Sequence, residues 1–299
     1  MKSNVLAILL LTATLQVTAA RDFRELTNLE GKKIKAELLD LNDGKIKIRA
    51  KGKVFEIPAD KLSKEDQTFL TEWDAKRKGS EEDLYYSEQM FADDFSGDDF
   101  GERWKHFKSE SVIQDGVLIG KTIDIKDHVA LDSVKFEGRR DLQVSLKFKF
   151  IGPDAKSFIV RFADTDCKEV HAGHIVFTSI GPKKGSILDG KTGTFKKEIF
   201  DKKKSGETLD ETTLEMLKTK KKTFDLDFEG SKDQWHDLVV RSKNDLVTVI
   251  IDGKEVGSFQ SEGLAHETKS TVSLLTYDSG IHYDDLEIKS APNSVIGED

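Results

Sequence analysis

Three acidic residues and two histidines lie close together near the middle of the chain: Asp164, Asp166, Glu169, His171 and His174. A histidine beside carboxylates can transfer protons or bind a transition metal. Asp164, His171 and His174 are therefore the candidate catalytic residues. No H-x-H or H-x-x-x-H spacing is present, so the cluster is predicted to bind no metal. The structural alternative, which we favour, places His171 in a loop and His174 at the start of a strand, hydrogen-bonded locally.

A second set of residues could bind a ligand. The period-two pattern of residues 158–162 directs Arg161 away from its apolar neighbours, so it could meet a sugar hydroxyl or a carboxylate, or pair with a neighbouring aspartate. Aromatic rings bind the apolar face of sugars. Trp104, Trp235 and Tyr277 are possible platforms, although Trp235 starts a core strand and is better explained by packing. The ligand-binding candidates are Arg161, Asp166, Trp104 and Tyr277.

The chain lacks the motifs of several enzyme classes. Hydrolysis of a sugar bond by two carboxylates needs them about 5–5.5 Å or about 6.5–9.5 Å apart, and no strand carries a run of the E-x-D-x-x-E kind. Asp164-Thr165-Asp166 comes nearest, but it follows a strand and is more simply a turn. No G-x-S-x-G, P-loop, GxGxxG or C-x-x-C motif supports acyl transfer, nucleotide binding or redox chemistry. Whether the protein is an enzyme stays open at this level.

An acidic stretch suggests a calcium site, because paired carboxylates on loops suit a hard cation. Its members are Asp93, Asp94, Asp98 and Asp99. The D-x-D-x-D-G spacing is absent, however, and surface acidity explains the cluster more simply. We therefore predict no cofactor, with calcium as the open alternative.

The net charge limits the classes of binding partner, and the cysteine content limits how the fold can be stabilised. The 299 residues carry a formal net charge of −8, and nucleic-acid binding needs a net basic face, so nucleic acid is not expected as the main partner. Cys167 is the single cysteine, which excludes an intramolecular disulfide. Stability must therefore come from an apolar core.

The first twenty residues have the pattern of a secretory signal peptide. Lys2 precedes an apolar run over residues 5–11, and small residues lie just before Arg21. A buried N-terminal helix is the alternative. No later run approaches eighteen apolar residues, so no transmembrane segment is expected. The sequence thus predicts export to the periplasm or the cell exterior.

Residues 21–76 predict a small barrel of three short strands and a helix. Alternating apolar residues mark strands near 34–38, 45–49 and 54–57, and the turns between them are Asp43-Gly44 and Lys51-Gly52. Ser63, three residues before Asp66, is typical of a helix cap. The polar stretch that follows, residues 77–90, has no apolar period and predicts a linker.

Residues 91–290 predict a mainly β domain, with 291–299 as a tail. Strands recur about every ten residues without a βαβ rhythm, which favours an antiparallel two-sheet sandwich. The clearest part is the meander over residues 235–260 with its Asp252-Gly253 turn. In it we expect Leu238 and Val240 to share a face with Leu246, Thr248 and Ile250. Residues 183–222 predict a solvated, lysine-rich insertion containing a short helix.

Two families resemble parts of this sequence. The segment GKKIKAELLDLNDGKIKIRAKGKVFEIPADKLSKEDQTFLTEW resembles the Sla-one homology domain, an SH3-like barrel, copies of which follow the signal peptides of exported planctomycete and verrucomicrobial proteins. The block order over residues 91–290, including Gly173-His174 and Ile251-Asp252-Gly253-Lys254, resembles the concanavalin-type lectin and glucanase jelly roll. More narrowly, it is similar to the 3-keto-disaccharide hydrolase domain, and Arg161 matches that family's arginine strand. That family usually carries a Gly-Tyr-Glu-x-Gln element on the strand where this chain has residues 171–176, which differ from it.

These resemblances imply a leading function and two alternatives. The leading hypothesis is an exported, non-catalytic protein whose jelly roll binds carbohydrate and whose barrel acts as an adaptor. The first alternative is a hydrolase or lyase of 3-keto or related glycosides. The second is a structural module that binds another envelope protein.

Overall fold

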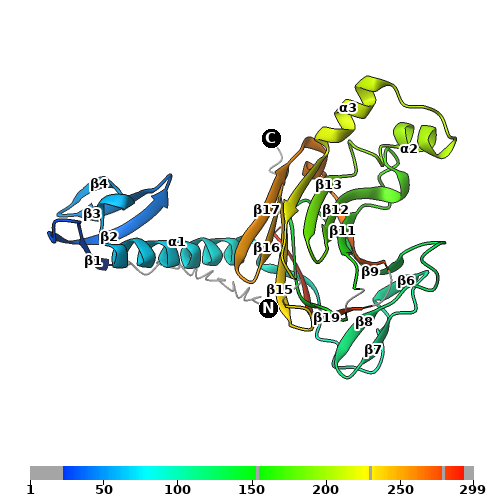
Figure 1. The fold of residues 1–299 in the computed structure, drawn as a ribbon, viewed down its shortest axis with the longest axis horizontal. Coiled ribbons are helices and arrows are strands. Elements are labelled where there is room, and N and C mark those ends of the chain that lie inside the picture. Colours follow the sequence, from blue (N-terminus) through cyan, green and yellow to red (C-terminus); the bar gives the residue numbers. More distant parts are fainter. Residues whose placement is uncertain (1–22, 153–154, 229–230, 278–279, 293–299) are drawn as a thin grey trace, which may run out of the picture. The chain divides into compact units, whose positions relative to one another are not determined.

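The computed structural model describes residues 23–152, 155–228, 231–277 and 280–292 (Figure 1). The predicted signal peptide, residues 1–20, and most of the predicted tail lie outside these residues. The chain divides into two compact units, Met1–Glu82 and Asp83–Asp299. Within the described residues, no helix is long and apolar enough to cross a membrane.

The N-terminal unit is a four-stranded antiparallel sheet followed by a helix. Its strands follow one another in space as they do in sequence. The core formed by Ala36, Ile46, Ile48 and Leu70 is buried. The sequence predicts three strands, and the additional one, β1, escapes detection because only one of its five residues is buried. The elements are β1 (Phe23–Thr27), β2 (Lys33–Asn42), β3 (Lys45–Ala50), β4 (Lys53–Pro58), η1 (Ala59–Lys61) and α1 (Lys64–Tyr85).

Helix α1 begins at the predicted cap. The Ser63 hydroxyl accepts the Asp66 backbone N–H at 3.2 Å, and the Asp66 carboxylate accepts from the Thr27 N–H at 2.8 Å and Arg24 Nε at 3.0 Å. Burial would raise the pKa of Asp66, but these hydrogen bonds outweigh it and lower the pKa. The carboxylate therefore ties the helix start to strand β1.

The predicted linker, residues 77–90, is helical as far as Tyr85, and its last three residues begin strand β5 (Glu88–Asp93). Arg77 pairs with Asp74 at 3.0 Å and with Glu81 at 2.6 Å, at helical spacings of three and four residues. Such pairs stabilise a helix that has no apolar stripe. The opposite-charge run that predicts a linker is thus part of α1, and the boundary between the two units falls inside this helix.

The C-terminal unit is an antiparallel two-sheet sandwich, as predicted (Figure 1). The first sheet has the order β17-β16-β15-β10-β19-β8-β7, with β5 also paired to β19. Its strands are β5 (Glu88–Asp93), β7 (Val112–Gln114), β8 (Val117–Gly120), β10 (Leu142–Phe150), β15 (His236–Lys243), β16 (Leu246–Ile251), β17 (Lys254–Gln260) and β19 (Ile281–Ser290).

The second sheet has the order β14-β13-β12-β11-β18-β9-β6. Its strands are β6 (Trp104–Phe107), β9 (Ala130–Arg139), β11 (Phe158–Ala163), β12 (His174–Ile180), β13 (Lys184–Asp189), β14 (Lys221–Asp225) and β18 (Lys269–Thr276). Between the two sheets lies one core, rich in aromatic residues such as Phe148, Phe158 and Tyr283. This core fixes the two sheets face to face.

Aspartate-glycine turns connect several strands. Asp115-Gly116 and Asp252-Gly253 have positive φ at both positions, 53° and 76° in the first and 51° and 75° in the second. Two-residue loops of this kind match the twist of an antiparallel pair, and glycine adopts such angles without strain. The predicted turns Asp43-Gly44 and Lys51-Gly52 have the same form.

The predicted face assignment in the meander is wrong. Lys243 pairs with Leu246 across a two-residue turn, and Val240 pairs with Val249. Even-numbered residues of β15 therefore share a face with odd-numbered residues of β16. Val247, Val249 and Ile251 are buried in the core, whereas Leu246 is exposed.

The predicted insertion, residues 183–222, is more ordered than its charge suggests. It contains strand β13, the start of the edge strand β14, and two helices, α2 (Lys197–Lys204) and α3 (Glu211–Thr219). The predicted short helix is α3. Both helices lie beyond one edge of the second sheet (Figure 1). Helix α2 is not predicted, because its apolar residues, Ile199 and Phe200, stand among lysines.

Candidate functional site

A groove of about 590 Å³ lies on the face of the second sheet that points away from the core. Its floor contains Ile159, Phe177 and Leu275, which form an apolar cluster separate from the core. They come from the neighbouring strands β11, β12 and β18. Alternation along these strands places one apolar set in the core and a second set in the groove.

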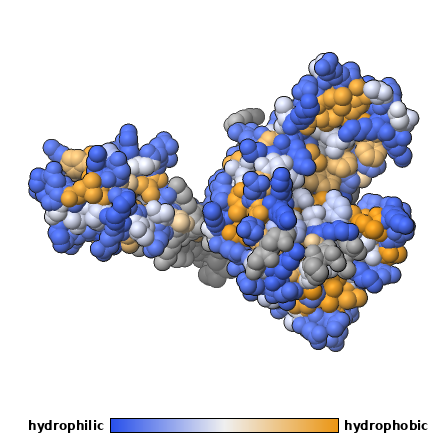
Figure 2. Space-filling view, viewed as in Figure 1, coloured by the Kyte–Doolittle hydropathy of each residue, from blue (hydrophilic) through white to orange (hydrophobic). Residues whose placement is uncertain are grey.

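Aromatic residues from the chain after β13 form one wall of the groove. The Phe195 ring stacks on Phe177 with centroids 4.8 Å apart and planes at 15°. The Phe200 ring of α2 stacks on His171 at 3.5 Å and 7°. Figure 2 shows the surface hollowed between the lobe that carries α2 and α3 and the lobe that carries β6 and β9. The predicted insertion thus covers part of the second sheet.

Arg161 projects into this groove from β11, as its alternation predicts. Its guanidinium donates to Ser273 Oγ at 2.8 Å and lies 3.2 Å from His174 Nδ1. Its side chain is only 7% exposed. Burial lowers the pKa of Arg161 to about 10, so the group is charged at neutral pH.

A β-bulge determines where His174 points. Phe162 pairs with Val176, but Ala163 pairs with His174, so Ile175 is the extra residue. Such an insertion re-aims the side chains that precede it. His174 therefore faces the groove together with Phe177. Burial, and then the charge of Arg161, lower the pKa of His174 to about 3, so the ring is neutral and its Nδ1 can accept from the guanidinium.

His171 lies at the start of the 3-10 turn η2 (His171–Gly173) and also lines the groove. The ring is half-buried between Phe200 and His174. Burial, with help from nearby lysines, lowers its pKa. The turn depends on Gly173, whose φ is +67° and whose backbone packs directly against Asp164.

Tyr277 lines the groove as well, beyond the end of β18. Polar side chains of Ser179, Ser186 and Thr194 lie among the aromatic ones. Of the described residues that line the groove, none is an aspartate or a glutamate. The groove therefore combines rings, hydroxyls and one buried cation.

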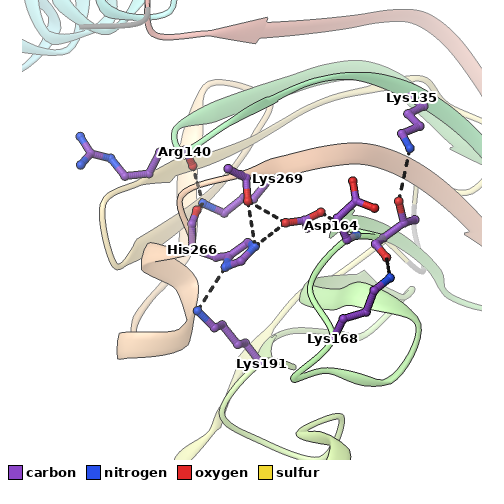
Figure 3. Close-up of polar contacts among 10 residues, drawn as sticks. Lys135, Arg140, Asp164, Lys168, Lys191, His266 and Lys269 are labelled. Carbon is purple, nitrogen blue, oxygen red and sulfur yellow. Dashed lines mark hydrogen bonds and ion pairs between the residues drawn. The ribbon is translucent and has the colours of Figure 1, made fainter. Parts of the chain in front are cut away.

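Asp164 and Asp166 do not line the groove. Asp164 Oδ2 accepts from His266 Nε2 at 2.8 Å and from the Thr268 hydroxyl at 2.6 Å (Figure 3). Lys191 Nζ lies 3.1 Å from His266 Nδ1, and an ammonium can only donate, so both nitrogens of that ring are engaged. Asp166 is exposed and its N–H donates to Asp164.

This Asp164 network ties the segment before β18 to the end of β11. Burial alone would raise the pKa of Asp164, but hydrogen bonds from Thr268 and His266 outweigh it and lower the pKa. The neighbouring Lys269 is fully buried and donates to the carbonyls of Arg140 and His266 (Figure 3). Burial lowers the pKa of Lys269 to about 7.

Trp104 lies in the core, 4% exposed, and its Nε1 donates to Asp93 Oδ2 at 2.8 Å. Its ring packs against those of Phe91, Phe95 and Phe100, so it presents no face to the groove. Asp93 also accepts the Phe95 N–H at 2.9 Å. A tryptophan among closely spaced aromatic residues is expected both in a sugar-binding platform and in a core. The sequence alone therefore could not decide which role Trp104 has.

The acidic stretch forms local turns. Asp94 accepts from Ser96, and Asp99 accepts the Gly101 N–H at 2.9 Å. Within the part of the chain that the structure describes, no three His, Cys, Asp or Glu side chains are grouped so that they could hold a metal ion. The free thiol of Cys167 is partly buried against the core.

Several groove residues carry no signal in the sequence. Phe195 and Phe200 belong to a charged stretch, and only the fold brings them over Phe177 and His171. Ser273 is placed beside Arg161 by strand register. The apolar residues on both faces of β11 were a usable signal, because a strand with two apolar faces needs cover on each.

No family model matches the chain, and no curated protein matches it in sequence. Among solved structures, the chain is similar to the carbohydrate-binding module CBM66 from Bacillus subtilis (8% identity, 63% of this chain and 96% of that chain, TM-score 0.42). It is also similar to an endo-β-1,3-glucanase from Pyrococcus furiosus (11%, 68% and 94%, TM-score 0.44). A third match is a sialidase (12% identity, TM-score 0.46), of which the chain covers 18% while 68% of this chain is matched. At these identities the similarities concern the fold alone.

Proposed function

We propose that the C-terminal unit binds a saccharide in the groove of the second sheet and does not cleave it. One observation carries this proposal: the groove is walled by aromatic rings and hydroxyls, and no carboxylate lies among its described lining residues. Rings and hydroxyls match the apolar face and the polar edge of a sugar. Two-carboxylate hydrolysis has no pair of acids there to perform it.

The alternative, a hydrolase or lyase of 3-keto or related glycosides, fits the groove less well. Proton transfer at neutral pH needs a group with a pKa near the working pH. The pKa of His174, about 3, makes that ring a weak base. Asp164 is held by His266 and Thr268, away from the groove. His171 would be left to act without an acid partner.

Replacing Tyr277 with alanine is expected to weaken saccharide binding about tenfold or more, because a ring that faces the sugar would be lost. A glycan array would select the saccharide, and calorimetric titration of the purified chain would give the affinities. Trp235→Ala is the matched control, since Trp235 is 38% exposed but does not line the groove. Equal affinity in the Tyr277 variant and the wild type would argue against this groove as the binding site.

We further propose that the protein is exported and that the N-terminal unit acts as an adaptor, in keeping with its resemblance to the Sla-one homology domain. The pattern of residues 1–20 supports export. Expression of the full chain in a bacterium should give a periplasmic or secreted product whose N-terminus, read by mass spectrometry, is close to Arg21. A cytoplasmic product that retains Met1 would contradict export.

A further inference from the structure

Arg161 is an unusual residue for the floor of the groove. Its neighbours there are Ile159, Phe177 and Leu275, all buried and apolar. A buried charge without an opposite charge costs more free energy than an apolar side chain of similar volume would. An arginine at this position therefore makes the fold less stable than an apolar residue would, which suggests that the guanidinium binds a ligand.

The other buried arginine of the described residues shows the contrast. Arg139 pairs with Glu88 at 2.9 Å and with Glu137 at 3.0 Å. Among the described residues, Arg161 has only Ser273 and the neutral His174 as polar partners. The Nε atoms of both arginines are buried without a hydrogen-bond partner among the described residues, so the contrast lies in the opposite charges that Arg161 lacks. Each terminal nitrogen of Arg161 carries two N–H groups and uses one of them for these partners, so the second N–H of each is left to bind an acceptor.

The surroundings of the groove do not neutralise this charge. No aspartate or glutamate is found among the described residues that line it, and Lys221 lines it as well. The nearest candidate acid in sequence, Asp164, is directed to His266 and Thr268 instead. The charged side chains among its described lining residues, Arg161 and Lys221, are thus both cationic, which favours a ligand that carries a negative charge.

We propose that the groove selects an acidic saccharide whose anionic group pairs with Arg161; this inference rests on the proposed saccharide binding. A guanidinium forms paired, charge-assisted hydrogen bonds with planar or tetrahedral anions. The sugar ring would lie against Phe195 and Tyr277 at the sides of the groove. A uronic carboxylate and a sulfate ester share this chemistry, and the experiment separates them.

The test titrates the full purified chain with pairs of tetrasaccharides that differ only in charge. The probes are tetragalacturonate and tetramannuronate with their methyl esters, and a sulfated galactan tetrasaccharide with its desulfated form. At least one acid should bind tenfold or more tightly than its neutral counterpart. Arg161→Met should remove that difference, and preference for the carboxylate or the sulfate arm assigns the anion.

The possible failures are distinguishable. If acidic and neutral members of every pair bind equally, the inference is overturned while saccharide binding stands. If no acidic or neutral saccharide binds, the proposed function fails and the inference with it. Should Arg161→Met not fold, the wild-type comparison of each acid with its neutral form decides alone, and Arg161→Lys tests whether charge without the planar fork is enough.

Discussion

Gly173→Ala is expected to destabilise the C-terminal unit by about 4 kcal/mol, because backbone strain and overlap act together. Gly173 has a φ of +67°, and an added Cβ would lie 2.0 Å from the Asp164 carbonyl oxygen and 2.4 Å from its carbonyl carbon. These are backbone atoms, so a side-chain rotation cannot relieve the overlap. The backbones of Asp164 and Gly173 are also hydrogen-bonded: the Asp164 N–H donates to the Gly173 carbonyl at 2.9 Å. This bond holds the end of β11 against the turn that carries His171 and His174.

The measurement is urea denaturation followed by tryptophan fluorescence and circular dichroism. Gly206→Ala provides the matched control, because Gly206 has a similar φ of +78° but nothing within 4 Å of its added Cβ. That variant should lose only about 1 kcal/mol, the cost of the strained angle alone. A Gly173 variant no less stable than the Gly206 variant would show that the turn can move, contrary to a rigidly positioned histidine pair.

The second large effect concerns pH and His174. Its pKa, about 3 in the folded protein, lies far below the ordinary value of 6.5. Below about pH 6.5 His174 is protonated in the unfolded chain but stays neutral in the folded chain. The unfolded state is therefore favoured as the pH falls, and the free energy of unfolding decreases. The free energy of unfolding is expected to fall by about 1.4 kcal/mol per pH unit between about pH 6 and pH 4 because of His174.

His174→Gln should remove this slope, because the amide can accept from Arg161 but does not titrate. Many carboxyl groups also titrate in this range, so the quantity to compare is the difference in unfolding free energy between variant and wild type at each pH. Phe195→Leu is the control: its ring lies 4.6 Å from that of His174 and carries no titratable group. If His174→Gln and wild type lose stability in parallel, the histidine does not hold a depressed pKa.

The sheets of the C-terminal unit were predictable where local signals agree. The alternation over Leu142–Phe150 gives β10, and the Asp115-Gly116 and Asp252-Gly253 turns give their hairpins. Strand β9 carries no comparable signal, although it lies next to β18 in the second sheet. It carries Asp132, which is buried but accepts from His106 and Ser111 and so breaks the apolar pattern. Burial of a satisfied polar residue cannot be read from hydropathy.

The groove was predictable only in part. The alternation of β11 places Arg161 opposite the core, and this prediction needs no tertiary information. The direction of His174 depends on a bulge at Ile175, which changes the parity of the strand and has no marker in the sequence. Phe195 and Phe200 belong to the lysine-rich insertion, residues 183–222, and only its folding brings their rings to the groove. Sequence proximity also suggested that Asp164 would join the histidines, but its carboxylate accepts from His266 and Thr268 instead.

A crystal structure of the full chain with the tightest-binding saccharide would show directly whether the groove of the second sheet is the binding site. We expect a sugar in the groove of the second sheet, with its ring against Tyr277 or Phe195 and a polar group within hydrogen-bond distance of Arg161. A saccharide bound instead on the first sheet, near Trp235, or on the N-terminal unit would contradict it.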